Sequence, residues 1–383
     1  MQQRKHQIDY PLLFIVIGLM IISLIAVYSG SGQYTQDSTF YFVQRQFIWY
    51  IIGFAIMFSI AFFDYELLER MAIYLYGIGL GLLLAVHFMG TTKNGSQRWI
   101  DLGFMDLQPS EFMKIFLILH VSVLLKRIGE ERISFARSIP FITKVIIYSS
   151  IPFALILVQP DLGSALIIAF IVITMIFISS ISIKMISLLG ASFVGLFFLV
   201  RFLFQHYFDA MGNILQPHQM GRIYGWLRPD EFASGYGYQL KQAILGIGAG
   251  QLTGHGFNQG IQVQNGKIPE AHTDFIFAVI GEEFGFIGAS LLIILYFLLI
   301  YRIITIGLSS TNLFGTYICV GVTGLLAFQV FQNIAMTIGL MPITGVTMPF
   351  ISYGGSALLA NMMALGLVLS VRMHSKEFMF SNE

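Results

Sequence analysis

Long apolar runs alternate with short polar segments along most of the chain. About ten of these runs reach the ~20 residues that an α-helix needs to cross the ~30 Å hydrocarbon core of a bilayer. They cover roughly residues 10–29, 46–63, 71–90, 109–127, 139–158, 162–181, 184–204, 275–301, 313–338 and 346–371. The pattern predicts an all-α integral membrane protein with about ten transmembrane helices, organised as one multi-pass domain over residues 1–383.

One connection, at about residues 205–273, is far longer than the others and separates the seventh predicted helix from the eighth. Long loops in compact domains are usually either functional or disordered. Trp226 and the apolar patch at residues 243–245 argue against disorder, because such side chains favour a packed environment. We expect part of this large loop to fold back against the membrane surface as a short amphipathic helix.

The connections differ in their content of lysine and arginine, which indicates the orientation of the chain. The connections predicted on one side of the membrane, together with the two termini, contain Arg4, Lys5, Arg70, Lys126, Arg127, Arg132, Arg137, Lys184, Arg302, Arg372 and Lys376. The short connections on the opposite side hold Arg45, Lys93 and Arg98. The richer side is therefore predicted to be cytoplasmic, with both termini inside and the large loop extracellular.

Composition excludes a soluble protein. Of the 383 residues, 56% are hydrophobic and 11% are charged, and the mean hydropathy is +0.77. A soluble domain carries about 25% charged residues, so this chain cannot cover a globular surface with polar groups. The net charge of +1 gives no sign of a nucleic-acid partner. The single cysteine, Cys319, cannot form an intramolecular disulfide and is expected to be a small core residue.

Asp274 stands where the large loop gives way to the eighth apolar run, so its carboxylate is expected at the boundary between water and membrane. It can cap the helix that follows, act as a general base, or bind a hard divalent cation such as Mg²⁺ or Mn²⁺. Glu282 and Glu283 follow in the same predicted helix, and three carboxylates exceed what capping requires. His272 is weak evidence for a zinc site, because two ligands at positions i and i+2 do not make a metal centre.

Glu111 and Lys114 place opposite charges inside the fourth predicted helix. Residues three positions apart share a helix face, so the two side chains can form an ion pair that stiffens the bundle. They can equally line a polar cavity, because ionisable groups within a span usually face water or the protein interior. Asp161, in a tight outer turn, either caps the sixth helix or lies beside the polar head of a substrate.

Several cations on the predicted outer side are candidates for binding an anionic group. Arg98, beside a tryptophan, can hold a phosphate with its planar guanidinium or anchor the chain at the membrane interface. The large loop adds Arg222, Arg228, Lys241 and Lys267. These four can together hold a pyrophosphate, and ordinary surface charge is the alternative.

The segment at residues 339–356 contains two prolines and several glycines, which disrupt regular helix. Irregular backbone at membrane depth is tolerated only where it is buried in protein or lines a wet cavity. We therefore expect this segment to form a cavity wall, to which Ser352 and Ser356 contribute hydroxyl groups.

Five motifs occur in order along the chain. They are Gln108-Pro109-Ser110-Glu111, Gln159-Pro160-Asp161-Leu162-Gly163, Gly237-Tyr238-Gln239, Pro269-Glu270 followed by His272-Thr273-Asp274-Phe275 and Gly281-Glu282-Glu283, and Pro349-Phe350-Ile351-Ser352-Tyr353-Gly354-Gly355-Ser356. Together they resemble the SEDS proteins (shape, elongation, division, sporulation) over nearly the whole chain. Residues 341–345 and 361–372 are more similar to the rod-shape branch, RodA, than to the division branch, FtsW.

The resemblance implies a peptidoglycan glycosyltransferase in the bacterial cytoplasmic membrane. Such an enzyme polymerises lipid II, a disaccharide-pentapeptide on undecaprenyl pyrophosphate, for cell-wall elongation and cell shape. It works at the outer face of that membrane with a class B penicillin-binding protein, a transpeptidase. The family's essential aspartate corresponds to Asp274 and its membrane-embedded pair to Glu111 and Lys114, while Gln239 joins the candidate substrate-binding residues. Two other classes stay open, a flippase for the same lipid and a non-catalytic scaffold for the transpeptidase.

Overall fold

The computed structural model describes residues 8–32, 36–93, 96–206, 217–229 and 235–375. Three of the cations used to predict the orientation, Arg4, Lys5 and Lys376, lie outside these residues. The two predicted cytoplasmic termini therefore stay predictions.

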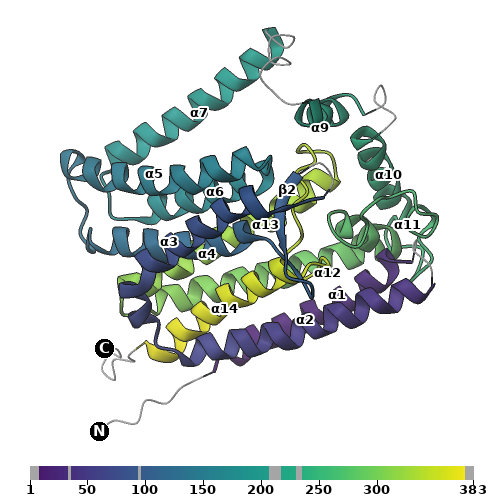
Figure 1. Cartoon of the computed structure of the whole chain (residues 1–383), viewed down its shortest axis with the longest axis horizontal. Coiled ribbons are helices and arrows are strands. Elements are labelled where there is room, and N and C mark those ends of the chain that lie inside the picture. Colours follow the sequence, from purple (N-terminus) through teal and green to yellow (C-terminus); the bar gives the residue numbers. More distant parts are fainter. Residues whose placement is uncertain (1–7, 33–35, 94–95, 207–216, 230–234, 376–383) are drawn as a thin grey trace.

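Long α-helices build most of the structure and lie side by side along its longest axis (Figure 1). In chain order they are α1 (Tyr10–Gly30), α2 (Gln36–Phe62), α3 (Tyr65–Met89), α4 (Pro109–Lys126), α5 (Phe135–Val158), α6 (Leu162–Ile178), α7 (Ile183–His206), α12 (Ile276–Leu308), α13 (Leu313–Thr337) and α14 (Gly355–His374). Within the described residues, 7 helices are long and apolar enough to cross a membrane. The apolar parts of α6 and α7 are shorter, and α4 carries two lysines and a glutamate. The chain is a multi-pass membrane protein, while the count of about ten spans stays a prediction.

The last long helix begins later than the apolar pattern suggests. Because α14 starts at Gly355, the predicted span at 346–371 is wrong at its start. Residues 341–354 form irregular backbone instead. Pro349 cannot donate a helical hydrogen bond, and Phe350 adopts a left-handed φ of 62°. The disruption of regular helix that was predicted for this segment is confirmed.

The described part of the large loop contains three helices, α9 (Pro217–Leu227), α10 (Tyr236–Ala249) and α11 (Ile261–Gln264). They gather at one end of the helix bundle (Figure 1), where α10 and α11 pack on α12. Trp226 of α9 donates its indole N–H to the carbonyl oxygen of Gly339 at 2.8 Å. This bond ties the large loop to the irregular segment between α13 and α14. Contact of α9 with the membrane surface stays a prediction.

A small antiparallel sheet, which the sequence did not predict, fills the connection between α3 and α4. Its strands, in the order β1–β2–β3, are β1 (Thr91–Lys93), β2 (Ser96–Asp101) and β3 (Asp106–Leu107). β1 and β3 have too few residues for a period of two to be recognised, and the six residues of β2 do not alternate between polar and apolar. The sheet matters for the site because β2 carries Arg98.

α12 is interrupted at Gly285, whose φ of 62° and ψ of −159° are not helical. Such a break leaves backbone N–H and C=O groups without helical partners. The segment at residues 251–256 supplies them. Its carbonyls accept from the two residues after Gly285 at 2.9 and 3.1 Å, and its N–H groups donate to the carbonyls of Glu282 and Glu283 at 3.1 and 3.0 Å. The large loop is therefore bonded to the first part of α12.

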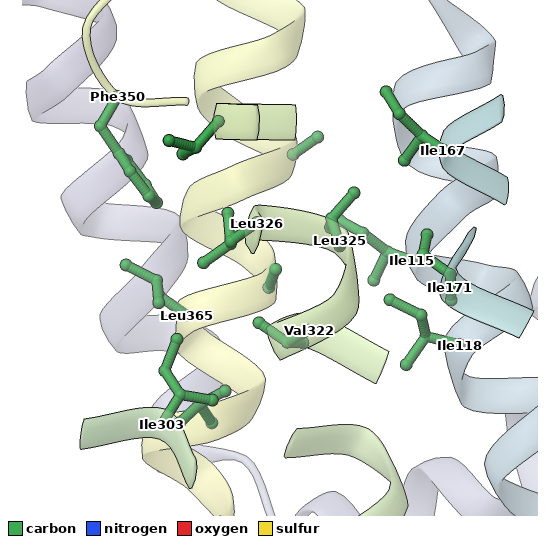
Figure 2. Close-up of a cluster of buried hydrophobic side chains, with 14 of the residues drawn as sticks. Ile115, Ile118, Ile167, Ile171, Ile303, Val322, Leu325, Leu326, Phe350 and Leu365 are labelled. Atoms are coloured by element: carbon green, nitrogen blue, oxygen red, sulfur yellow. The ribbon is translucent and has the colours of Figure 1, made fainter. Parts of the chain in front are cut away.

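The core is centred on α13. Figure 2 shows Val322, Leu325 and Leu326 of α13 between two sets of side chains, with Ile115, Ile118, Ile167 and Ile171 on one side and Ile303, Phe350 and Leu365 on the other. All of these side chains are buried. Cys319, on the same helix, is buried as well, which confirms its prediction as a core residue.

Candidate functional site

A cavity of ≈ 820 Å³ opens beside the start of α12, at the end of the bundle that carries β2, α9 and α10. Its volume falls within the range of about 300–1,000 Å³ that is typical of small-molecule sites. Five of the residues singled out from the sequence line it: Asp274, Arg98, Arg222, Gln239 and Ser356. Parts of the chain that are far apart in sequence therefore converge on Asp274.

The backbone that carries Asp274 is held from two directions. Asn333 of α13 donates its side-chain amide to the carbonyl of Asp274 at 2.9 Å and to the carbonyl of Val346 at 2.8 Å. One amide group thereby joins α13, the turn before α12 and the irregular segment. Ser352, from that same segment, donates its hydroxyl to the carbonyl of Thr273 at 2.6 Å. These bonds fix where the carboxylate of Asp274 lies in the cavity.

Gly345 leaves space beside the carboxylate. A Cβ atom at this position would lie 3.3 Å from Oδ2 of Asp274, and the φ of 72° favours glycine. Asp274 is half-buried and lines the cavity, so a substrate group can reach its carboxylate. The irregular segment thus forms a cavity wall, as its proline and glycine content predicted.

The environment of Asp274 raises its pKa to about 6. Burial of the carboxyl group is the main cause, and the nearby carboxylate of Glu270 acts in the same direction. Arg222 and Arg98 lower the pKa, because their positive charges favour the ionised form. A carboxylate whose pKa lies this close to neutrality can both accept and release a proton during a reaction cycle.

Arg98 is fastened to the turn that precedes α6. Its Nε donates to the carbonyl of Gln159 at 3.3 Å, and its Nη2 donates to the carbonyl of Pro160. Its Nη1 lies 3.5 Å from Oδ1 of Asp161. The same carboxylate accepts the N–H of Ser164 at 3.0 Å, so Asp161 caps α6, as one of its two interpretations predicted. Asp161 orients Arg98 and is not itself part of the described cavity lining.

The structure brings Glu111 and Lys114 together but not to the cavity. Nζ of Lys114 donates to Oε1 of Glu111 at 2.8 Å, and the two residues are 1% and 6% exposed. Neither belongs to the described cavity lining. The geometry therefore supports the prediction that Glu111 and Lys114 form an ion pair within the helix bundle. Oε2 of Glu111 has no hydrogen-bond partner among the described residues.

The four loop cations do not form one set. Arg228, Lys241 and Lys267 are outside the described cavity lining, and only Arg222 reaches it. Nη1 of Arg222 donates to the carbonyl of Thr344 at 3.3 Å, which holds the guanidinium against the irregular segment. A pyrophosphate held by all four loop cations at this cavity does not fit the structure.

The two serine hydroxyls bond to the backbone. Ser352 accepts the N–H of Met348 at 2.8 Å in addition to its bond with the turn before α12. Ser356 donates to the carbonyl of Asp106 at 2.6 Å and accepts the N–H of Gln108 at 3.1 Å. Both residues shape the cavity wall, and Ser356 also links the start of α14 to the small sheet.

Sequence reasoning gave no role in a site to Arg45 and Trp49 of the cavity lining, and it named Glu270 only as part of a family motif. Arg45 was assigned to a short connection because the apolar run begins at about residue 46. Since α2 begins earlier, at Gln36, Arg45 lies inside a helix and points its charge into the cavity lining. Asn333 was missed as well. Its signal was a polar amide inside an apolar span, which usually marks an interior contact.

Glu282 and Glu283 are fully buried and bind the backbone of the large loop. The two carboxylate oxygens of Glu282 accept the N–H groups of Gln262 and Val263 at 2.7 and 3.1 Å. Glu283 accepts the N–H of Asn258 at 3.1 Å and a side-chain amide at 3.2 Å. Both acids therefore hold α11 and the preceding segment against α12, a role that the sequence did not reveal.

The described residues contain no group of three or more His, Cys, Asp or Glu side chains arranged to hold a metal ion. Asp274 and Glu270 nevertheless both line the cavity. Mg²⁺ is commonly bound by one or two carboxylates together with substrate phosphates. A divalent cation would fit here if the substrate and water supplied its remaining ligands.

The chain is similar to known proteins over nearly its whole length. The sequence profile of the FtsW/RodA/SpoVE family, described as cell cycle proteins, matches residues 10–377. Stage V sporulation protein E of Bacillus subtilis (strain 168) is 36% identical over 98% of this chain and 100% of its own length. Peptidoglycan glycosyltransferase MrdB of Escherichia coli (strain K12) is 34% identical over 97% of this chain and 95% of its own length. These nearly equal identities do not assign a branch, so the RodA branch stays a prediction.

The similarity extends to three dimensions. A solved structure of a peptidoglycan synthase complex, concerned with the coordination of polymerization and crosslinking, contains a chain that is 30% identical. The two chains superpose with a TM-score of 0.77 over 95% of this chain and 97% of the other. The arrangement of helices described above is therefore one that a solved membrane-protein structure shares.

Proposed function

This chain belongs to the FtsW/RodA/SpoVE family of cell cycle proteins, and we propose that it is a peptidoglycan glycosyltransferase that polymerises lipid II. The observation that carries the proposal is Asp274, a carboxylate of raised pKa that lines a polar cavity beside Arg222 and Arg98. The relatives named as peptidoglycan glycosyltransferases support the same activity. Its role would be cell-wall elongation and the maintenance of cell shape.

In the proposed reaction, the 4-hydroxyl of the acceptor sugar attacks the anomeric carbon of the donor lipid II. Asp274 takes the hydroxyl proton while the new C–O bond forms, and the bond between the anomeric carbon and the pyrophosphate oxygen breaks. Undecaprenyl pyrophosphate leaves from the opposite face of the sugar. A single inversion therefore converts an α-linked donor into a β-linked glycan.

Negative charge grows on the departing pyrophosphate, and cations that are already in position stabilise it most effectively. Arg222 and Arg98 are held in place by backbone carbonyls, and Arg45 adds a third guanidinium to the cavity. A bound Mg²⁺ or Mn²⁺ would neutralise the same charge. Asp274 would then serve as its ligand rather than as the base.

The proposed partner is a class B penicillin-binding protein, whose transpeptidase would crosslink the new strands. The similarity to a chain from a peptidoglycan synthase complex supports this pairing. The proposed location is the bacterial cytoplasmic membrane, with the cavity open to the outer face and both termini in the cytoplasm. The distribution of lysine and arginine among the connections supports this orientation.

A flippase for the same lipid is the second candidate, because the buried Glu111–Lys114 pair is the kind of group that translocation paths contain. The cavity argues for polymerisation, since its lining comes from the elements at one end of the bundle and does not include that pair. A non-catalytic scaffold is the third candidate, and it would tolerate replacement of Asp274. A variant of Asp274 therefore distinguishes an enzyme from a scaffold.

Polymer formation from purified lipid II tests the proposal, with and without the transpeptidase partner. Asp274→Asn keeps the size of the side chain and removes the base. Asp101→Asn is the matched control, since Asp101 is an exposed carboxylate on β2 at the same end of the molecule. We expect glycan chains from the wild type and from the control, and none from Asp274→Asn.

Two outcomes would replace the proposal. Undiminished polymerisation by Asp274→Asn would remove the catalytic role of this residue, and lipid movement across sealed vesicles without any polymer would assign a transporter. Addition of a chelator tests whether a divalent cation takes part. Loss of polymer with chelator, restored by Mg²⁺ or Mn²⁺, would show that the reaction needs a divalent cation, for which Asp274 is a candidate ligand.

A further inference from the structure

A second cavity, of ≈ 780 Å³, lies between the start of α3, the end of α4, the middle of α5 and the connection from α12 to α13. Figure 1 shows that the turn from α2 to α3 is at the opposite end of the bundle from α10 and α11. The distribution of lysine and arginine places this end on the predicted cytoplasmic side. No step of the proposed polymerase reaction uses this cavity.

His120 of α4 contributes an unusual group to the wall of this cavity. It is 5% exposed, and among the described residues neither ring nitrogen has a hydrogen-bond partner. The ring stacks on Tyr76 at 4.9 Å and meets the edge of Tyr148 at 4.5 Å. The hydroxyl of Tyr76 donates to the carbonyl of Tyr148 instead. Buried polar groups in folded proteins nearly always have partners, and an acceptor on a ligand in this cavity would supply one to the imidazole N–H.

The cations of the cavity fall into two kinds. Nζ of Lys126 lies 2.6 Å from Oε2 of Glu69, so these two charges neutralise each other. Arg70 and Arg127 also line the cavity and are exposed. Within the part of the chain that the structure describes, neither arginine forms an ion pair. Two guanidinium groups are therefore available to one anionic group.

Carboxylates and apolar side chains complete the lining. Asp64 caps α3, with Oδ1 accepting the N–H of Glu66 at 3.0 Å, and Glu66 accepts the side-chain amide of Asn312 at 3.2 Å. Both acids line the cavity. The apolar part of the wall consists of Leu67, Ala72, Ile73, Val123 and Leu124. A ligand that matches this lining carries an anion, a cation and an apolar part.

We propose that this cavity binds the head group of a zwitterionic phospholipid. The phosphate lies against Arg70 and Arg127, the ammonium group lies against Asp64 and Glu66, and an ester or phosphate oxygen accepts the N–H of His120. A lone anion would face the carboxylates, and a lone cation would face the arginines. The apolar wall takes the glycerol and the first acyl carbons. This wall, at the ends of membrane helices, favours a lipid over a soluble zwitterion.

Native mass spectrometry of the delipidated, full-length protein tests the proposal with phosphatidylethanolamine as the probe. Arg70→Gln/Arg127→Gln removes the phosphate contacts. Arg132→Gln/Arg137→Gln is the matched control, with the same loss of charge at exposed residues outside the described cavity lining. We expect one retained lipid per wild-type molecule, weakened about tenfold or more by the first pair and unchanged by the control.

A second variant tests the role of the imidazole. His120→Phe keeps an aromatic ring between Tyr76 and Tyr148 and removes both nitrogens. We expect weaker lipid retention, while the lipid-free protein unfolds at the same or a higher temperature. Phosphatidylglycerol, which lacks the ammonium group, is expected to be retained less than phosphatidylethanolamine.

Three results would overturn the proposal. Equal retention of phosphatidylethanolamine by the wild type and by Arg70→Gln/Arg127→Gln would show that the lipid binds elsewhere. Equal retention of phosphatidylglycerol would mark an unselective surface lipid. Competition by glycerophosphoethanolamine at the same concentration would assign the cavity to a soluble zwitterion. Because the readouts are lipid binding and thermal unfolding, the result does not depend on polymerase activity.

Discussion

Asp274 lies in the turn just before α12, and Glu282 and Glu283 lie within the first turns of that helix, yet the surroundings of these carboxylates differ. Glu282 and Glu283 are fully buried, and their oxygens accept hydrogen bonds from the large loop. Asp274 is held through its main chain by Asn333, and its carboxylate faces a cavity. A carboxylate that accepts hydrogen bonds from backbone N–H groups stabilises the packing of the segments that it joins. A carboxylate that is positioned but left facing a cavity is suited to chemistry.

The largest difference between the two kinds of carboxylate is expected in polymerisation rate. Asp274→Asn removes the proposed base, and loss of a general base slows a reaction by about 10²–10⁴-fold. The thermal unfolding temperature should stay close to that of the wild type, because Asn preserves the size of the side chain. A purified-protein assay with lipid II, combined with thermal unfolding, measures both. A variant that unfolds early would mean that Asp274 is structural, like Glu283.

The amide bridge of Asn333 gives the next largest effect. Asn333→Leu leaves one buried and one part-buried carbonyl without their donor, at a cost of about 1–3 kcal/mol, and lets the turn that carries Asp274 move. We expect a fall in kcat of about ten- to a hundredfold, with a smaller change in KM. Asn361→Leu is the matched control, a buried amide on α14 outside the described cavity lining. Equal losses of kcat in both variants would reduce the role of Asn333 to general stability.

Cations inside and outside the cavity should differ in the same assay. Arg222→Gln removes a charge from the cavity lining and is expected to slow polymerisation by about tenfold, since charge-assisted contacts are worth about 1.5–3 kcal/mol. Arg228→Gln, with the same change at an exposed position outside that lining, should keep the rate of the wild type. A matching loss in Arg228→Gln would show that the whole loop, and not the cavity, holds the pyrophosphate.

Glu283→Gln should affect stability rather than chemistry. It weakens the bonds from the large loop to α12, and the expected loss is about 1–3 kcal/mol of unfolding free energy. Limited proteolysis should cut the variant earlier within residues 250–265, while the rate per folded molecule stays near that of the wild type. A normal unfolding temperature with lost activity would place Glu283 in the reaction instead.

The smallest effect is a shift of the pH profile. Since Asp274 has a pKa of about 6, the general-base role predicts that kcat falls as the pH drops through this value, because the protonated carboxyl cannot accept a proton. Glu270→Gln removes a charge that raises the pKa, so the acidic limb should move to lower pH. Arg222→Gln should move it to higher pH, by up to about one unit in each case. If the acidic limbs of the Glu270→Gln and Arg222→Gln profiles did not move in opposite directions, the acidic limb would not report the titration of Asp274.

Much of the architecture could be predicted because membrane helices are encoded by local apolar runs. The order of the long helices and the irregular segment between α13 and α14 followed from the composition of short windows. The position of Asp274 followed in the same way, since it marks the change from a polar loop to an apolar run. Boundaries were less accurate at α2 and α14, where polar residues continue a helix or prolines delay it.

The composition of the site could not be predicted to the same depth, because it depends on contacts between segments far apart in sequence. Asn333 was missed for this reason, and three of the four loop cations that could have held a pyrophosphate lie outside the described cavity lining. Arg45 was missed because the start of α2 was predicted too late. The five motifs identified the neighbourhood of the site. They did not distinguish residues that line the cavity from residues that hold its walls, such as Ser352 and Asp161.

The sequence by itself determined that this chain is a membrane protein of long helices, with a carboxylate where a polar loop gives way to an apolar run. These properties are local, because each apolar run must satisfy its own backbone hydrogen bonds as a helix. Only the tertiary structure decided which of three neighbouring carboxylates faces a cavity, which arginines join it, and that α12 is broken and bonded to the large loop. Those outcomes depend on which distant groups meet, and no short stretch of sequence records that.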